Sequence, residues 1–116
     1  MEIDMIRGDT LVLTFQLTDE NGEMILMSDI DTLILTARQR PNQSSDIIFA
    51  KNKEKFYIDD GLYAVEILPV DTEQQTVSTL FLDIEVTLID GTRKTKVMKL
   101  NLERDVTIHG GDKIEN

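Results

Sequence analysis

The chain has 116 residues, enough for one hydrophobic core and too few for two, so we expect a single domain. It carries 12 Lys and Arg against 22 Asp and Glu and no Cys, and the net charge of −10 argues against nucleic acid as a partner. The sequence has no secretory signal and no apolar run of the ~20 residues needed to span a membrane, so we expect no membrane insertion.

The prevailing period of the sequence is two, which is the pattern of half-buried β-strands. In the strongest segment, residues 79–90, Leu82 and Ile84 face one way while Asp83 and Glu85 face the other. The segments that alternate in this manner are 10–18, 32–38, 63–67, 79–90 and 98–103. We expect Phe15, Phe49 and Tyr63 to lie in the core that these strands enclose.

Three dipeptides mark tight turns between the strands. Asn21-Gly22, Asp60-Gly61 and Asp90-Gly91 all tolerate a positive φ, and each is followed by another strand-like run. The sequence therefore predicts three hairpins. The clearest of them pairs residues 79–89 with residues 92–104.

One segment breaks the period of two. Residues 69–75 begin with Pro69 and contain Asp71 and Thr72, which predicts a single helical turn. Such a turn is a common way of crossing between two sheets.

Together these elements predict an all-β fold: an antiparallel immunoglobulin-like β-sandwich of seven or eight strands over residues 1–108, with a flexible C-terminal tail at 109–116. A small β-barrel is the alternative.

No constellation of catalytic residues is apparent, and we expect neither an enzyme nor a cofactor. The single His, His109, lies beside two Gly residues in the predicted tail, where nothing would orient it as a general base. The carboxylate pairs Asp59 with Asp60 and Asp29 with Asp31 occupy predicted turns, which favour Asp for local reasons.

Two further motifs are better explained by turns than by binding. Residues 19–22, Asp-Glu-Asn-Gly, lack the ligand spacing and the distal Glu of a calcium loop, so we expect no metal site. The tripeptide Arg7-Gly8-Asp9 precedes the first long strand and is interpreted as a turn leading into it. A glycan-binding module remains an alternative function, with Phe81 and Tyr57 as the rings that could form its platform.

The order of these elements resembles a known family. Arg7-Gly8-Asp9-Thr10 leading into an alternating strand, the turn at 19–22 and the strand carrying Arg38 are similar to the N-terminal immunoglobulin-like module of bacteriophage upper baseplate and tail-fibre proteins. The second half carries the closer likeness. It consists of Leu68-Pro69-Val70-Asp71-Thr72, then Leu82-Asp83-Ile84-Glu85-Val86-Thr87, Asp90-Gly91-Thr92, Lys94-Thr95, Leu100-Asn101-Leu102 and Asp105-Val106-Thr107.

The resemblance implies a non-catalytic structural role in the tail of a bacteriophage or prophage. Its partners would be phage tail or baseplate proteins, further copies of the chain, or both, and its location would be the virion after synthesis in the host cytoplasm. A bacterial β-sandwich module that binds a glycan or a protein is the alternative.

A docking role requires an apolar surface, and apolar residues out of phase with their strands are the candidates for it. Such residues mark either the overlap between two sheets or a protein interface, and both readings stay open at this point. The candidate interface residues are Val12, Ile34, Phe81, Ile89 and Val97.

Overall fold

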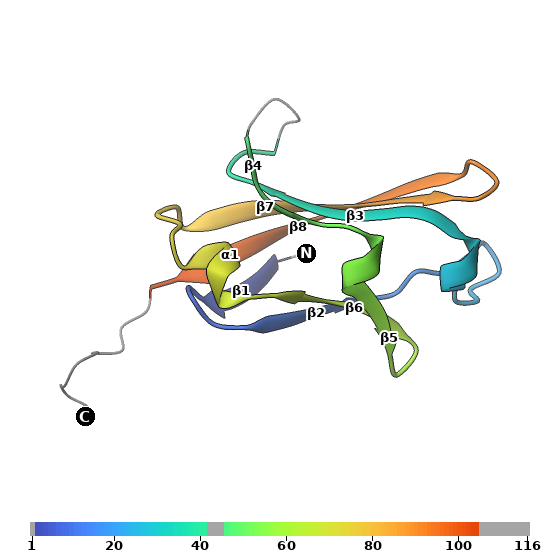
Figure 1. Cartoon of the computed structure of the whole chain (residues 1–116), viewed down its shortest axis with the longest axis horizontal. Helices are drawn as coiled ribbons and strands as arrows, with labels where there is room; N and C mark the ends of the chain where they lie inside the picture. Colours follow the sequence, from blue (N-terminus) through green and yellow to red (C-terminus); the bar gives the residue numbers. More distant parts are fainter. Residues whose placement is uncertain (1, 42–45, 105–116) are drawn as a thin grey trace.

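A computed structural model describes residues 2–41 and 46–104 of the chain. Eight strands form two sheets that face each other across one hydrophobic core (Figure 1). The predicted all-β sandwich is therefore confirmed. The predicted tail at 109–116, with His109, lies outside the described residues.

One sheet has five strands and the other has three. The larger sheet has the order β1 (Glu2–Ile6), β8 (Arg93–Glu103), β7 (Thr79–Leu88), β3 (Ile30–Arg38) and β4 (Ile47–Lys51). The smaller sheet has the order β2 (Leu11–Phe15), β6 (Leu62–Ile67) and β5 (Phe56–Asp59).

Two of the three predicted hairpins form as expected. The β7–β8 hairpin turns at Asp90-Gly91, where Gly91 has a φ of 93°, and its register pairs Thr87 with Arg93 and Thr79 with Asn101. Asp60-Gly61 joins β5 to β6. The turn at Asn21-Gly22 also forms, but it is closed by an isolated bridge between Thr18 and Met24 and not by two strands, so the third hairpin prediction is wrong.

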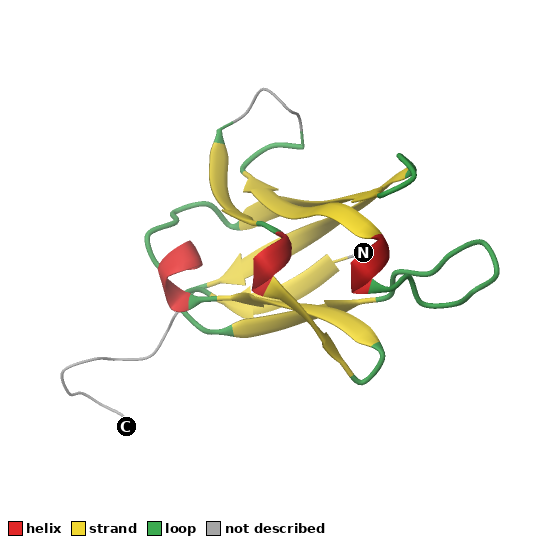
Figure 2. Ribbon diagram, turned by 45° about the vertical axis from the view of Figure 1, so that its right-hand side comes forward, coloured by secondary structure: helices red, strands yellow, loops and turns green. Residues whose placement is uncertain are grey.

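The connections divide into two kinds. Hairpin connections join strands of the same sheet, whereas every crossing between the sheets uses a turn or a short helix. The predicted helical turn is confirmed as α1 (Pro69–Thr72), which carries the chain from β6 to β7. Two 3₁₀ turns that the sequence did not predict serve two of the other crossings: η1 (Met27–Asp29) before β3 and η2 (Lys53–Lys55) between β4 and β5 (Figure 2). The turn at Arg7-Gly8-Asp9 carries the chain from β1 to β2.

The larger sheet differs from the prediction in one pairing. β1 runs parallel to β8, with Glu2 opposite Lys99 and Ile6 opposite Glu103, so the sheet is mixed and not purely antiparallel. Local patterns do not reveal this pairing, because β1 has five residues and its partner lies almost 100 positions away. β4 was also missed, since its five residues lack a clear alternation.

Alternation places one face of each long strand in the core. On β7, Leu80, Leu82, Ile84 and Val86 are buried, as the period of two predicts. Phe15 and Tyr63 are buried and stack with ring centroids 5.9 Å apart, which confirms both as core residues. Phe49 is only partly buried and packs at the margin of the core.

Polar contacts hold the crossover α1 against the start of the chain. The Gly8 backbone N–H donates to Oγ1 of Thr72 at 2.9 Å, and Thr72 is fully buried. The Arg7 guanidinium donates to the Val77 carbonyl at 2.8 Å. Gly8 has a φ of 88°, so the Arg-Gly-Asp motif forms the predicted turn, and that turn is fastened to the crossover.

Candidate protein interface

Among the described residues, no three His, Cys, Asp or Glu side chains are placed so that they could hold a metal ion together. None of the helices in the described part of the chain has the length and apolar character that crossing a membrane requires. The candidate residues in the sequence concern a protein interface, and several surfaces could dock a protein. They comprise the outer faces of the two sheets, the ends of the sandwich, and the edge strands, which are β1 and β4 in one sheet and β2 and β5 in the other.

The five predicted interface residues lie on the outside of the sandwich. Ile34, Phe81 and Val97 project from the outer face of the five-stranded sheet, Val12 projects from the outer face of the other sheet, and Ile89 lies in the β7–β8 turn. The exposed fractions are 38% for Ile34, 44% for Val12, 58% for Val97 and 69% for Ile89, while Phe81 is half-buried. Overlap between the sheets is thus the wrong reading for these residues, because neither sheet covers them.

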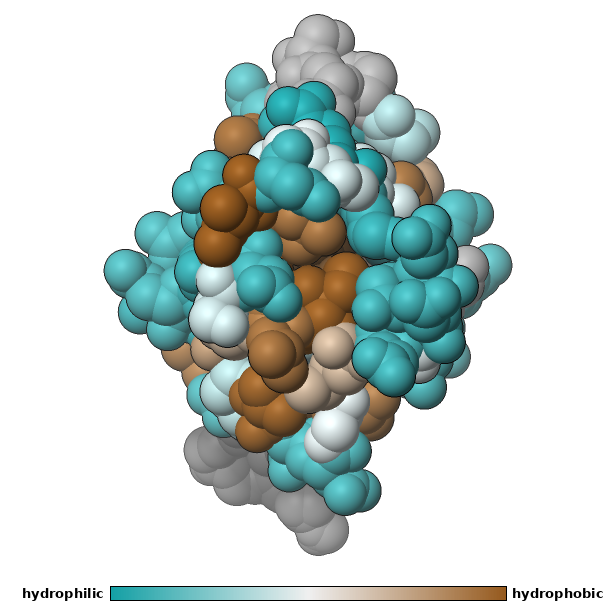
Figure 3. All heavy atoms as spheres, turned by 90° about the vertical axis from the view of Figure 1, so that its right-hand side faces the viewer, coloured by the Kyte–Doolittle hydropathy of each residue, from teal (hydrophilic) through white to brown (hydrophobic). Residues whose placement is uncertain are grey.

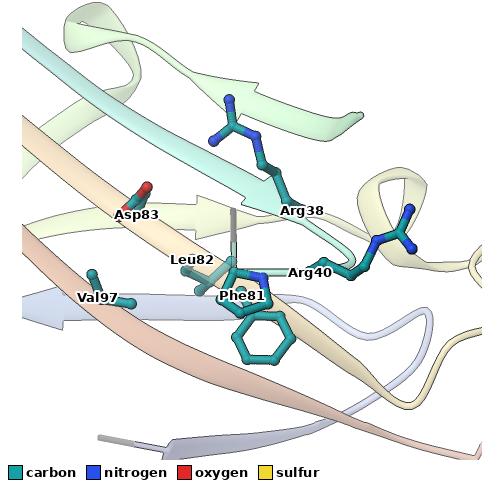
Figure 4. Close-up of a pocket in the computed structure, with 7 residues that line it drawn as sticks. Arg38, Arg40, Phe81, Leu82, Asp83 and Val97 are labelled. Carbon is teal, nitrogen blue, oxygen red and sulfur yellow. The ribbon is translucent and has the colours of Figure 1, made fainter. Parts of the chain in front are cut away.

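The structure brings only two of the five into one site. Phe81 on β7 and Val97 on β8 line a depression of about 240 Å³ on the outer face of the larger sheet (Figure 4). Its other lining residues are Arg38, Arg40, Pro41, Leu82 and Asp83. We call this depression the outer-face pocket. It combines an apolar floor with guanidinium groups, a mixture that is enriched at protein interfaces.

A cation packs on the aromatic ring of this pocket. The Lys99 ammonium lies 5.9 Å from the centroid of the Phe81 ring. Next to it, the Asn101 side-chain amide donates to the carboxylates of Glu2, at 3.0 Å, and Asp4, at 2.9 Å. These contacts hold β1 against β8 on the same face, so the surroundings of the outer-face pocket are ordered.

A second apolar depression lies at the end of the sandwich to which the β7–β8 hairpin points. Figure 3 shows this end, with apolar atoms gathered at its centre and hydrophilic residues around them. A cavity of about 370 Å³ there is lined by Met24, Ile25, Leu88, Ile89 and three aspartates, Asp19, Asp29 and Asp90. Sequence reasoning found Ile89 but missed the rest, because the 19–29 segment meets the hairpin only in the tertiary structure.

Two of the aspartates of this end cavity are engaged in local hydrogen bonds. Oδ1 of Asp19 accepts the backbone N–H groups of Asn21, at 2.9 Å, and Glu23, at 3.0 Å. Asp90 accepts the Thr92 N–H at 2.8 Å, and this bond lowers the pKa of the Asp90 carboxyl. Asp19 therefore closes the turn that the sequence predicts at residues 19–22.

Two apolar side chains on edge strands, Ile47 and Ile58, also escaped prediction. Ile47 on β4 and both Tyr57 and Ile58 on β5 are exposed. The signal was weak because neither strand alternates clearly. Tyr57 and Phe81 lie on different sheets, so the two rings proposed for a glycan platform do not form one.

Comparison with known proteins supports the fold and does not identify a family. No protein-family model matches the chain, and no curated protein sequence matches it. Among solved structures, MtrC from Shewanella baltica OS185 is similar to 87% of this chain with a TM-score of 0.58 and 14% sequence identity. The match spans 22% of the MtrC chain, so the likeness is between this sandwich and one part of a longer protein.

Proposed function

We propose that this chain is a non-catalytic docking protein of a bacteriophage or prophage tail, located in the baseplate or beside a fibre. It would act in the virion through contacts with tail proteins, with other copies of itself, or with both. The proposal starts from the resemblance to the immunoglobulin-like module of upper baseplate and tail-fibre proteins. The observation that supports it most is the outer-face pocket, where Phe81 and Val97 are held on a rigid sheet beside Arg38 and Arg40.

The chemistry of that pocket suits a protein partner better than a small substrate. Its floor is apolar, and its lining combines an aromatic ring with arginine side chains, residue types that are enriched at protein interfaces. It lies on the outer surface of a five-stranded sheet. Side chains of an adjacent subunit could fill it while the surrounding sheet provides the contact area that a stable interface needs.

The test is to induce the prophages of the producing bacterium, purify the particles on a gradient and probe the fractions for this chain. The proposal expects the chain to sediment with intact particles in stoichiometric amount. A Phe81→Ser/Val97→Ser variant should be lost from the particles, while Val12→Ser, at a candidate residue on the other sheet and away from the outer-face pocket, should be retained. Complete particles that lack the wild-type chain would contradict the proposal.

The second candidate function is a bacterial β-sandwich module that binds a glycan or a protein ligand. It is favoured by the similarity to one part of MtrC, since a sandwich within a longer bacterial protein is an arrangement typical of such modules. Retention of the chain on immobilised glycans, lost on Phe81→Ala or Tyr57→Ala substitution without a change in folding, would support this function over the tail role.

A further inference from the structure

The half of β8 nearest the Asp90-Gly91 turn has a neighbouring strand on one side only. β7 pairs with β8 along Arg93 to Asn101, whereas β1 pairs with it only from Lys99 to Glu103. Among residues 2–41 and 46–104, no strand pairs with residues 93–98 on the side where β1 lies farther along. We call residues 93–98 the open edge of β8.

The direction of the backbone hydrogen bonds identifies the groups that face this edge. Leu88 donates its N–H to the Thr92 carbonyl and Leu102 donates its N–H to the Ser78 carbonyl, both at 2.8 Å. In an antiparallel ladder such bonded pairs recur at every second residue, so the even-numbered residues of β8 bond to β7. The N–H and C=O groups of Thr95 and Val97 therefore point to the open edge and can receive another strand.

The open edge is basic in a chain whose net charge is −10. Arg93, Lys94 and Lys96 are all exposed, and no ion pair within the described part of the chain involves them. Lys94 and Lys96 stand on the inner face of β8, opposite Val86 and Ile84 of β7. Their ammonium groups are therefore available to carboxylates of a strand that lies along the edge.

A cavity beside the edge can accept side chains of such a strand. It measures about 170 Å³ and lies between the segment that follows β2 and the open edge. Its lining includes the buried apolar residues Phe15, Leu17, Ile84 and Val86, together with Lys94 and Lys96. This combination suits a Glu side chain, whose methylene groups can contact the apolar floor while its carboxylate pairs with a lysine.

Charge argues against a second copy of the chain as the occupant. Two open edges paired antiparallel about a two-fold axis would bring Lys94 and Lys96 of one copy against the same residues of the other. Like charges across a strand pair are destabilising, and lysines on edge strands commonly prevent such self-pairing. The same lysines attract an edge partner of opposite charge.

We propose that the open edge of β8 accepts an extended acidic segment of a partner protein. The segment adds a strand beside Thr95 and Val97 and places carboxylates against Lys94 and Lys96, while its alternate side chains lie beside exposed Val97 on the outer face. The inference rests on the proposed docking role for its biological setting, and it adds a second docking site, separate from the outer-face pocket, together with the chemistry of its partner.

The test uses two fluorescein-labelled decapeptides and the full chain at low ionic strength. One peptide alternates Glu with Val, and the other alternates Glu with Pro, which keeps the charge but removes every second backbone N–H. Fluorescence anisotropy should give a dissociation constant about tenfold lower for the Glu–Val peptide. Equal binding of the two peptides, or no binding of either, would overturn the proposal.

Charge-reversal variants then locate the site. Lys94→Glu/Lys96→Glu should weaken binding of the Glu–Val peptide by about tenfold or more. Lys55→Glu/Arg104→Glu changes the net charge by the same amount at exposed positions off the open edge and serves as the matched control. The same loss in both variants would mean that the peptide responds to overall charge and not to this edge.

A backbone variant separates strand pairing from electrostatic attraction. Thr95→Pro removes an N–H that points to the open edge and keeps all the charges; it should weaken binding about tenfold, because proline is tolerated on edge strands but cannot donate. Unchanged binding would overturn strand addition. In case this variant fails to fold, hydrogen exchange on the wild-type chain should show the Thr95 and Val97 amides slowed by the Glu–Val peptide, and no slowing would equally overturn it.

These outcomes are independent of the particle experiment. That experiment measures whether the chain is present in virions, and the peptide experiment measures whether one edge accepts an acidic strand. Failure of the peptide test with the chain present in particles would overturn strand addition at the open edge and leave the tail role, with the outer-face pocket as its docking site, in place.

Discussion

The ammonium group of Lys51 lies 2.6 Å from Oδ2 of Asp71, and only 11% and 10% of the two side chains are exposed. The same carboxylate oxygen accepts the Leu68 backbone N–H at 2.7 Å. Lys51 ends β4, an edge of the five-stranded sheet, and Asp71 belongs to α1, the crossover from the other sheet. The pair therefore fastens a sheet edge to the connection between the two layers.

Removal of the cation should destabilise the fold, because the carboxylate of Asp71 would stay nearly buried without its counter-ion, with the Leu68 N–H as its remaining partner. We expect Lys51→Met to lower the free energy of unfolding by about 2 kcal/mol, measured by urea denaturation followed by circular dichroism. In Lys51→Met/Asp71→Asn the loss should be smaller than the sum of the single changes. Additive single and double changes would contradict a direct interaction.

The buried hydroxyl of Thr72 should contribute through its bond to the Gly8 N–H. Thr72→Val keeps the shape but leaves that donor without its acceptor, so we expect a loss of about 1–2 kcal/mol. Thr72→Ser retains the oxygen and should lose less. Urea midpoints of the two variants make the comparison, and a Val variant as stable as the Ser variant would show that the bond is not needed.

Stability should fall in alkaline solution through Tyr63. Burial and the nearby charge of Asp29 raise the pKa of the Tyr63 phenol above its ordinary value near 10, and its hydroxyl donates to the Ile25 carbonyl at 2.5 Å. Because the folded-state pKa is the higher one, the contribution is fully present below pH 10. It is lost as the pH rises from there through the folded-state pKa.

Thermal unfolding between pH 8 and pH 11 tests this dependence. The melting temperature of the wild-type chain should drop more steeply above pH 10 than that of Tyr63→Phe, which has no proton to lose at this position. The Phe variant should also be less stable at neutral pH by about 1 kcal/mol, since the Ile25 carbonyl loses its donor. Parallel pH profiles for the two proteins would contradict the raised pKa.

Neighbouring residues of β7 and β8 should differ sharply in their effect on stability. Leu82 is buried, and Leu82→Ala should cost about 2–5 kcal/mol. Val97, on the outer face, should change the free energy of unfolding by less than about 0.5 kcal/mol when replaced by Ser. Urea denaturation measures both, and a costly Val97→Ser would mean that this residue serves the fold and not an interface.

The β7–β8 hairpin shows how far local patterns reach. The alternation of apolar and polar residues identifies the buried face of its strands, and Gly91 in Asp90-Gly91 adopts the positive φ of its turn. The strands, their buried face and the turn therefore all follow from residues that are close together in the chain. Asn21-Gly22 supplies the same turn geometry, yet the flanking residues form one bridge only. A turn dipeptide determines the bend, while the strands beside it depend on partners that lie elsewhere.

The outer-face pocket also depends on contacts between distant parts of the chain, which local patterns do not reveal. Sequence reasoning selected Phe81 and Val97 as out-of-phase residues, but it could not separate sheet overlap from an outer face, because both give the same alternation. Pairing of β7 with β8 makes them neighbours. Arg38 and Arg40 join them from the end of β3, more than 40 positions earlier in the chain.

The sequence by itself determined the all-β class, the inward face of each long strand and the turns, because alternation and backbone conformation act between neighbouring residues. Only the tertiary structure decided which edges stay open and which distant side chains meet. β1 covers half of β8 in a parallel pairing, and Lys51 reaches Asp71 across the crossover. Such contacts depend on how the two sheets pack, and packing is a property of the whole chain.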